Sequence, residues 1–91
     1  MPTQLIPAVI EKISPSATEG DVFVEVESLK EQEISFLFSD ALGKLVKVDK
    51  RTLLKGNNIM QFDVWNLPQG IYFIVPSSSG GRNMPTKFVK L

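Results

Sequence analysis

Residues 21–27 read Asp-Val-Phe-Val-Glu-Val-Glu, and their alternation is the clearest structural signal in the chain. The three valines alternate with charged or aromatic residues, which is the two-residue period of a strand with one buried face. The same period recurs in residues 33–39, where Ile34, Phe36 and Phe38 share a face. No part of the sequence shows a convincing helical period, so we expect a protein built from strands.

Turn sequences separate the strand-like runs at intervals of roughly 8 to 12 residues. Asp40-Ala41-Leu42-Gly43 suits a short hairpin with Gly43 at positive φ, and Leu67-Pro68-Gln69-Gly70 has the proline and glycine positions of a type I turn. These signals predict an all-β protein, an antiparallel immunoglobulin-like β-sandwich of about seven strands. The expected strands cover residues 5–14, 21–27, 33–39, 44–50, 58–64, 71–75 and 87–91.

The core should come from the positions of these strands that share the inward face. We expect it to contain Val22, Val24, Val26, Ile34, Phe36, Phe38, Val46, Met60, Phe62, Leu67, Tyr72, Ile74 and Phe88. Residues 15–20 and 77–81 are expected to be loops. The continuous apolar run 71–75 fits a strand that is buried on both faces or under an edge. Pro85 has no backbone donor, so the last strand should be an edge or be interrupted there.

The composition excludes several classes of function. The 91 residues include 10 basic and 10 acidic side chains, no Cys and no His. Disulfides and thiolate metal sites are therefore excluded, and the commonest general base and transition-metal ligand is missing. A net charge of zero and the lack of a long apolar run argue against nucleic-acid binding and a membrane span. We expect one small, non-catalytic domain without a cofactor.

Two groups of polar residues could suggest chemistry. Ser39 lies beside Asp40, but no histidine or suitably spaced lysine supports a nucleophile, so hairpin capping is the better interpretation. Glu19, Asp21 and Glu25 lack the dense oxygen spacing of a calcium loop. No catalytic or metal-binding residue is therefore predicted.

The charges are unevenly distributed along the chain. Residues 1–45 hold three basic and eight acidic groups, whereas residues 46–91 hold seven basic and two acidic groups. Cross-strand pairing within the sandwich is the simpler interpretation. The alternative is a basic patch near the last strand that meets an acidic partner.

From Ile13 onward the chain resembles the C-terminal sorting domain of proteins exported by the type IX (Por) secretion system, in a form similar to type A. The resemblance rests on four ordered segments: Asp40-Ala41-Leu42-Gly43-Lys44, Gly56-Asn57-Asn58, Asn66-Leu67-Pro68-Gln69-Gly70-Ile71-Tyr72 and Lys87-Phe88-Val89-Lys90-Leu91. Two positions depart from the family pattern. Ser14-Pro15-Ser16-Ala17 keeps only the first proline of a Pro-Asn-Pro element, and Trp65 replaces a small polar residue.

The resemblance implies a function. Residues 13–91 would be the sorting domain, and residues 1–12 a linker or first strand that joins an upstream cargo domain. Its partners would be the type IX outer-membrane machinery and a sortase-like protease that removes the domain. The protein would pass through the periplasm to the outer-membrane surface or the extracellular space. Residues 1–10 have no secretory signal pattern, so the chain is either cytoplasmic or a piece of a longer precursor.

Individual residues of these segments also have structural interpretations. Pro68, Gly70 and Tyr72 suit a β-turn in which the Tyr72 ring enters the core and its hydroxyl finds a partner at the rim. In the segment 87–91, Phe88 and Lys90 should point one way and the other three residues the opposite way. This segment is either an edge strand guarded by lysines or an address with unpaired amides that docks by strand addition.

Trp65 should share the outward face of Asp63. It would either contact a sugar or a partner protein, or cap one end of the sandwich. Two other functions stay open on the residues alone. One is an accessory fibronectin-like or carbohydrate-binding module of a surface protein, and the other is a cytoplasmic protein that dimerises through its edge strands.

Overall fold

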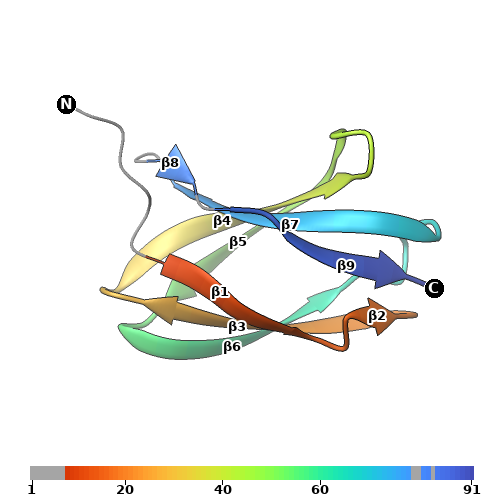
Figure 1. Cartoon of the computed structure of the whole chain (residues 1–91). Coiled ribbons are helices and arrows are strands. Elements are labelled where there is room, and N and C mark those ends of the chain that lie inside the picture. The colour runs from red at the N-terminus through yellow and green to blue at the C-terminus, as the bar shows by residue number, and fades with distance from the viewer. Residues whose placement is uncertain (1–7, 79–80, 83) are drawn as a thin grey trace.

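Nine strands and no helix make up the part of the chain that the computed structural model describes, which is residues 8–78, 81–82 and 84–91. The strands pack as two layers (Figure 1). Their bounds are β1 (Ala8–Ser14), β2 (Ala17–Thr18), β3 (Asp21–Ser28), β4 (Gln32–Asp40), β5 (Leu45–Leu53), β6 (Gly56–Asp63), β7 (Gly70–Ser78), β8 (Gly81–Arg82) and β9 (Thr86–Lys90).

One layer is a three-stranded sheet in the order β1-β3-β6. The other is a six-stranded sheet in the order β2-β9-β7-β4-β5, with β8 paired to β7. Every pairing is antiparallel except that of β2 with β9, which is parallel. The predicted immunoglobulin-like sandwich is therefore confirmed, with one parallel pair added at an edge.

Each of the seven predicted strands has a counterpart within a few residues. Residues 5–7 of the first predicted strand, and 79–80 of the predicted loop 77–81, lie outside the described residues. Three segments that were predicted to be loops are strand instead: β2, the last two residues of β7 (77–78) and Gly81 of β8. The last strand begins at Thr86, directly after Pro85, so the interruption expected at that proline is confirmed.

Alternating residues of facing strands fill the space between the sheets. The Phe62 ring lies 5.1 Å from that of Phe36 and 5.3 Å from that of Phe38, measured between centroids. This cluster joins the two layers, because Phe62 belongs to β6 and the other two belong to β4. The buried core consists of Ala8, Val22, Val24, Val26, Ile34, Phe36, Phe38, Leu53, Met60, Phe62, Val64, Tyr72, Ile74 and Phe88.

The predicted core was wrong at one position and incomplete at three. Val46 is exposed, because its neighbour Lys47 pairs with the inward-facing Phe38, so Val46 lies on the outward face together with Val48. Leu67 is half-buried and packs against the core. The members of this core that the prediction missed are Ala8, Leu53 and Val64.

The strand β7 is covered on one side only. Tyr72 and Ile74 are buried, whereas Ile71 on the opposite face is 44% exposed. Of the two alternatives for residues 71–75, burial on both faces was therefore wrong.

Candidate functional site

The hairpin between β4 and β5 is held by the carboxylate of Asp40. Its Oδ1 accepts hydrogen bonds from the backbone amides of Leu42 and Lys44, both at 2.9 Å. The amide of Gly43 donates to the carbonyl oxygen of Asp40 at 3.0 Å, and Gly43 has a φ of 85°. The predicted positive φ and the predicted hairpin capping are thus confirmed. The Asp40 carboxylate caps the hairpin through the amides of Leu42 and Lys44 and does not activate Ser39.

The turn before β7 is held by the hydroxyl of Tyr72. This hydroxyl donates a hydrogen bond to the carbonyl oxygen of Pro68 at 2.6 Å. The Tyr72 ring is 4% exposed and stacks on Phe88, with the centroids 5.6 Å apart. Gly70 has a φ of 153°, which residues with a side chain rarely adopt. Tyr72 therefore anchors the turn to the core, as its sequence context predicted.

The break at residues 56–58 is closed by the side chain of Asn58. Its Oδ1 accepts from the amide of Leu54 at 2.9 Å, and its Nδ2 donates to the carbonyl oxygen of Leu54 at 2.8 Å. Gly56 lies at the bend with a φ of 103°. This segment therefore has a structural role at the turn between β5 and β6.

The hairpin, the turn and the last strand lie together at one end of the six-stranded sheet (Figure 1). Asp40 pairs with Tyr72 across β4 and β7, and Tyr72 pairs with Phe88 across β7 and β9. We call residues 40–44, 66–72 and 88–91 the motif end. A hollow of about 310 Å³ opens there, lined by Asp40, Ala41, Leu42, Pro68, Gln69, Gly70, Ile71 and Tyr72.

The last strand, β9, lies inside the sheet between β7 and β2. The amide of Val89 donates to the carbonyl oxygen of Ser16 at 2.9 Å, and that of Leu91 donates to the carbonyl oxygen of Thr18 at 2.8 Å. The expectation of an edge with unpaired amides was therefore wrong for these two residues, because a two-residue strand covers them.

The side chains of β9 alternate as predicted. Phe88 and Lys90 face the interior, with exposed fractions of 0% and 8%, and the Nζ of Lys90 donates to the backbone oxygen of Leu91 at 3.3 Å. Lys87 is exposed and Val89 is half-buried on the other face. The segment 87–91 is thus half core and half surface, so only its outward side chains are open to a partner.

Thr18 supports the last strand, and the sequence interpretation missed it. Its Oγ1 donates to the carbonyl oxygen of Asp21 at 2.6 Å and accepts from the amides of Gly20 and Asp21, both at 3.1 Å. The local pattern of a threonine followed by Gly20-Asp21 indicates such a turn. The hydrogen bond from the amide of Leu91 to the carbonyl oxygen of Thr18 could not be predicted from the local sequence, because the two residues are 73 positions apart.

Trp65 covers Gly20 at the end of the sandwich. A Cβ added to Gly20 would overlap the indole ring, so the ring lies directly on the glycine. The amide of Trp65 donates to Oδ1 of Asp63 at 2.9 Å, which fixes the backbone, and 58% of the residue stays exposed. Trp65 thus caps this end of the sandwich, and a contact with a sugar or a partner stays a prediction.

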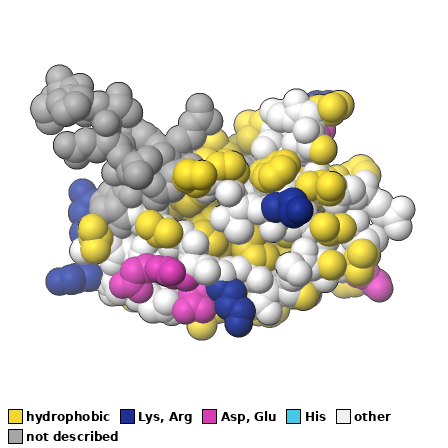
Figure 2. All heavy atoms as spheres, viewed as in Figure 1, with side chains coloured by type: hydrophobic (Ala, Val, Ile, Leu, Met, Phe, Trp, Pro, Cys, Tyr) yellow, Lys and Arg dark blue, Asp and Glu magenta, His cyan; other side chains and the backbone are white. Residues whose placement is uncertain are grey.

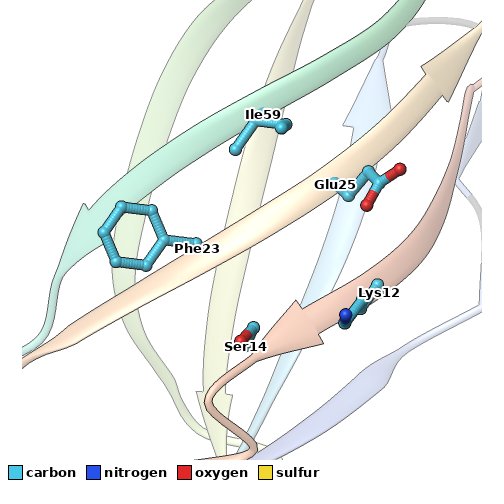
Figure 3. A pocket seen from close by; sticks show the side chains of 5 residues that line it. All are labelled: Lys12, Ser14, Phe23, Glu25 and Ile59. Atoms are coloured by element: carbon cyan, nitrogen blue, oxygen red, sulfur yellow. The ribbon is translucent and has the colours of Figure 1, made fainter.

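A smaller hollow lies on the outer face of the three-stranded sheet (Figure 3). It has a volume of about 150 Å³, which suits one ring or one side chain. Its lining comes from three adjacent strands: Lys12 and Ser14 from β1, Phe23 and Glu25 from β3, and Ile59 from β6. Oε1 of Glu25 also accepts from Nδ2 of Asn57 at 2.9 Å, so this carboxylate already has a partner within the sheet.

The charged side chains pair less than the sequence suggested. Among the described residues, one ion pair joins the acidic and basic halves of the chain, from Lys50 Nζ to Glu33 Oε1 at 3.9 Å. Arg51 pairs with Asp49 at 2.8 Å within the basic half and also donates to the carbonyl oxygen of Gln61 at 2.8 Å. Cross-strand ion pairs between the acidic residues of 1–45 and the basic residues of 46–91 therefore explain little of the uneven charge distribution.

Residues 8–78, 81–82 and 84–91 contain no group of three or more acidic, His or Cys side chains placed to hold a metal ion. Nor do these residues form a helix that is long and apolar enough to cross a membrane.

Comparison with known proteins identifies the family. No curated protein matched the chain. The sequence profile of the family described as the secretion system C-terminal sorting domain matches residues 12–90, which covers strands β2 to β9 and the motif end except Leu91. The chain therefore belongs to the family of type IX secretion-system C-terminal sorting domains.

Proposed function

We propose that this domain is a non-catalytic export signal that acts as a folded unit. The type IX machinery of the outer membrane recognises it and delivers the cargo protein attached to it to the cell surface. A sortase-like protease then removes the domain. Because the sandwich is rigid, little conformational entropy is lost when it docks.

One observation carries this proposal: the last strand is part of the sandwich and also presents a surface. Phe88 is fully buried in the core, and the amides of Val89 and Leu91 are bonded to Ser16 and Thr18. The segment that the family resemblance marks as the address is therefore held in one conformation. A partner would read the outward side chains Lys87 and Val89, together with Leu91, which is 53% exposed.

The experiment is a fusion of a Sec signal peptide, a reporter and the full chain, expressed in a bacterium with a type IX system. We expect the reporter at the cell surface, measured by its accessibility to added protease in intact cells. A reporter that stays in the periplasm with the full chain attached would contradict the proposal.

Deletion of residues 87–91 would be ambiguous, because it also removes Phe88 from the core. The sharper variants are Lys87→Ala and Val89→Ser, whose side chains face outward. We expect both to lower surface display while the melting temperature stays close to that of the wild type. Phe88→Ala is the matched comparison in which the fold itself is damaged.

A further inference from the structure

The outward face of the six-stranded sheet is apolar across four neighbouring strands. Leu37 of β4 lies directly opposite both Val48 of β5 and Val75 of β7. Ile71 of β7 lies opposite Val89 of β9 in the same way. We define the outer apolar face by six residues: Leu37, Val48, Ile71, Phe73, Val75 and Val89.

This face differs from that of an ordinary solvated sheet, which carries polar residues at alternate positions. Val48 is 53% exposed and Ile71 is 44% exposed, and the other four residues are half-buried. Figure 2 shows hydrophobic side chains gathered over β7 and β9, with a basic side chain among them. Contiguous apolar surfaces of this kind mark sites of interaction.

The outer apolar face has a hollow at the side of the β4–β5 hairpin. Its volume is about 260 Å³, and its lining residues are Ser39, Asp40, Ala41, Gly43, Phe73, Val75 and Pro85. Phe73 and Val75 belong to the outer apolar face, so the hollow continues that surface. Protein interfaces often rest on one apolar side chain that fills such a hollow.

The same face carries one charge that is left without a partner in the described part of the chain. Lys87 lies opposite Phe73, is exposed, and forms no ion pair with the described residues. Two other charged residues on this face, Lys50 and Glu33, form an ion pair with each other, with Nζ and Oε1 3.9 Å apart. A partner that covers the face must therefore bring a carboxylate to Lys87.

We propose that the outer apolar face docks a protein of the export machinery that inserts an apolar side chain beside Phe73 and places a carboxylate against Lys87. This inference rests on the proposed export function and names the surface through which it acts. A second copy of the domain would bring another Lys87, and the carboxylates it offers here are already engaged, Glu33 with Lys50 and Asp40 with the hairpin amides, so it fits less well. A single lysine also gives only weak attraction to an anionic membrane.

The test in cells uses the reporter fusion with the double variant Ile71→Ser/Lys87→Glu. The matched control is Leu29→Ser/Lys30→Glu, which makes the same changes at two exposed residues between β3 and β4, outside the hollows described above. We expect the first variant to lower surface display at least roughly tenfold, as the loss of an interface anchor does, and the control to leave it unchanged. Thermal melting establishes that both variants are folded.

Equal display of the two double variants, or a loss confined to the control, would overturn this inference while leaving the proposed function in place. Absence of display with the wild-type chain would instead count against the proposed function. In that case a binding measurement on the purified full chain still tests whether the outer apolar face binds an apolar group that carries a negative charge.

That measurement is a fluorescence titration with 8-anilino-1-naphthalenesulfonate, which combines aromatic rings with a negative charge. We expect binding at least roughly tenfold weaker for Ile71→Ser/Lys87→Glu than for the wild type and the control. Equal affinity for all three proteins would overturn the inference.

Two further outcomes would assign the face to another occupant and so overturn the proposal. One is sedimentation of the wild type, but not of Ile71→Ser/Lys87→Glu, with phosphatidylglycerol vesicles. The other is a concentration-dependent dimer in size-exclusion chromatography that the same variant abolishes.

Discussion

The hydroxyl of Tyr72 donates a hydrogen bond of 2.6 Å to the carbonyl oxygen of Pro68, four residues earlier in the chain. The ring of the same tyrosine stacks on Phe88 of the last strand. One side chain therefore links the turn before β7 to the strand that ends the domain. Immunoglobulin domains contain a comparable tyrosine at a strand corner, where its hydroxyl bonds back to the backbone a few residues upstream.

Tyr72→Phe should weaken the domain without changing its fold, because the ring is kept and the hydrogen bond is lost. We expect the free energy of unfolding to fall by about 1 kcal/mol. For a domain of this size that corresponds to a melting temperature lower by roughly 4–8 °C, measurable by circular dichroism. An unchanged melting temperature would show that the hydroxyl does not hold the turn.

Gly20→Ala should destabilise the domain, because the new methyl group would overlap the Trp65 indole. We expect a loss of about 1–3 kcal/mol, the usual effect of overpacking. The control is the same substitution in a Trp65→Ala background, where the methyl group has space and the loss should be smaller. Additive effects in this double-mutant cycle, measured by urea denaturation, would contradict the contact.

Asp40→Ala should loosen the β4–β5 hairpin, because the amides of Leu42 and Lys44 lose their acceptor. The expected loss of unfolding free energy is about 1–2 kcal/mol. Asp40→Asn keeps the accepting Oδ1 and should lose clearly less. The comparison is the midpoint of urea denaturation, and equal midpoints for the two variants would mean that the carboxylate oxygen is not the cap.

The amides of Val89 and Leu91 should be protected from hydrogen exchange, although they lie in the last three residues of the chain. Amides this close to a free chain end usually exchange at the unfolded rate. Because these two donate to Ser16 and Thr18, we expect exchange at least roughly tenfold slower, as measured by NMR. Exchange at the unfolded rate would show that β2 does not hold the last strand in solution.

The sequence was sufficient for the strands whose buried residues alternate, and for the turns whose side chains bond within a few residues. Asp40 with Gly43 and Pro68 with Tyr72 are such turns, because each interaction closes within four residues. The position of Val46 could not be predicted in this way. The alternation in residues 44–50 fits either face, and the pairing of β5 with β4, which sets Lys47 opposite Phe38, decides which one is buried.

The pairing of β2 with β9 was also beyond local sequence patterns. Ala17 and Thr18 form a strand of two residues, which gives no periodic signal, and their partners lie about 70 residues later. For this reason the last strand was expected to have unpaired amides. In the structure the amides of Val89 and Leu91 are bonded to Ser16 and Thr18, and only the outward side chains of the strand can contact a partner. The assembly of hairpin, turn and last strand into one motif end likewise depends on the sheet order, which local periodicity does not determine.

The decisive measurement for the assignment as an export signal is the dependence of surface display on the type IX machinery. The same Sec–reporter–domain fusion is expressed in a wild-type host and in a host that lacks a functional type IX system. We predict that added protease reaches the reporter on intact wild-type cells, and that in the deficient host the reporter stays protected in the periplasm. Equal surface exposure in both hosts, or protection in both, would contradict the assignment.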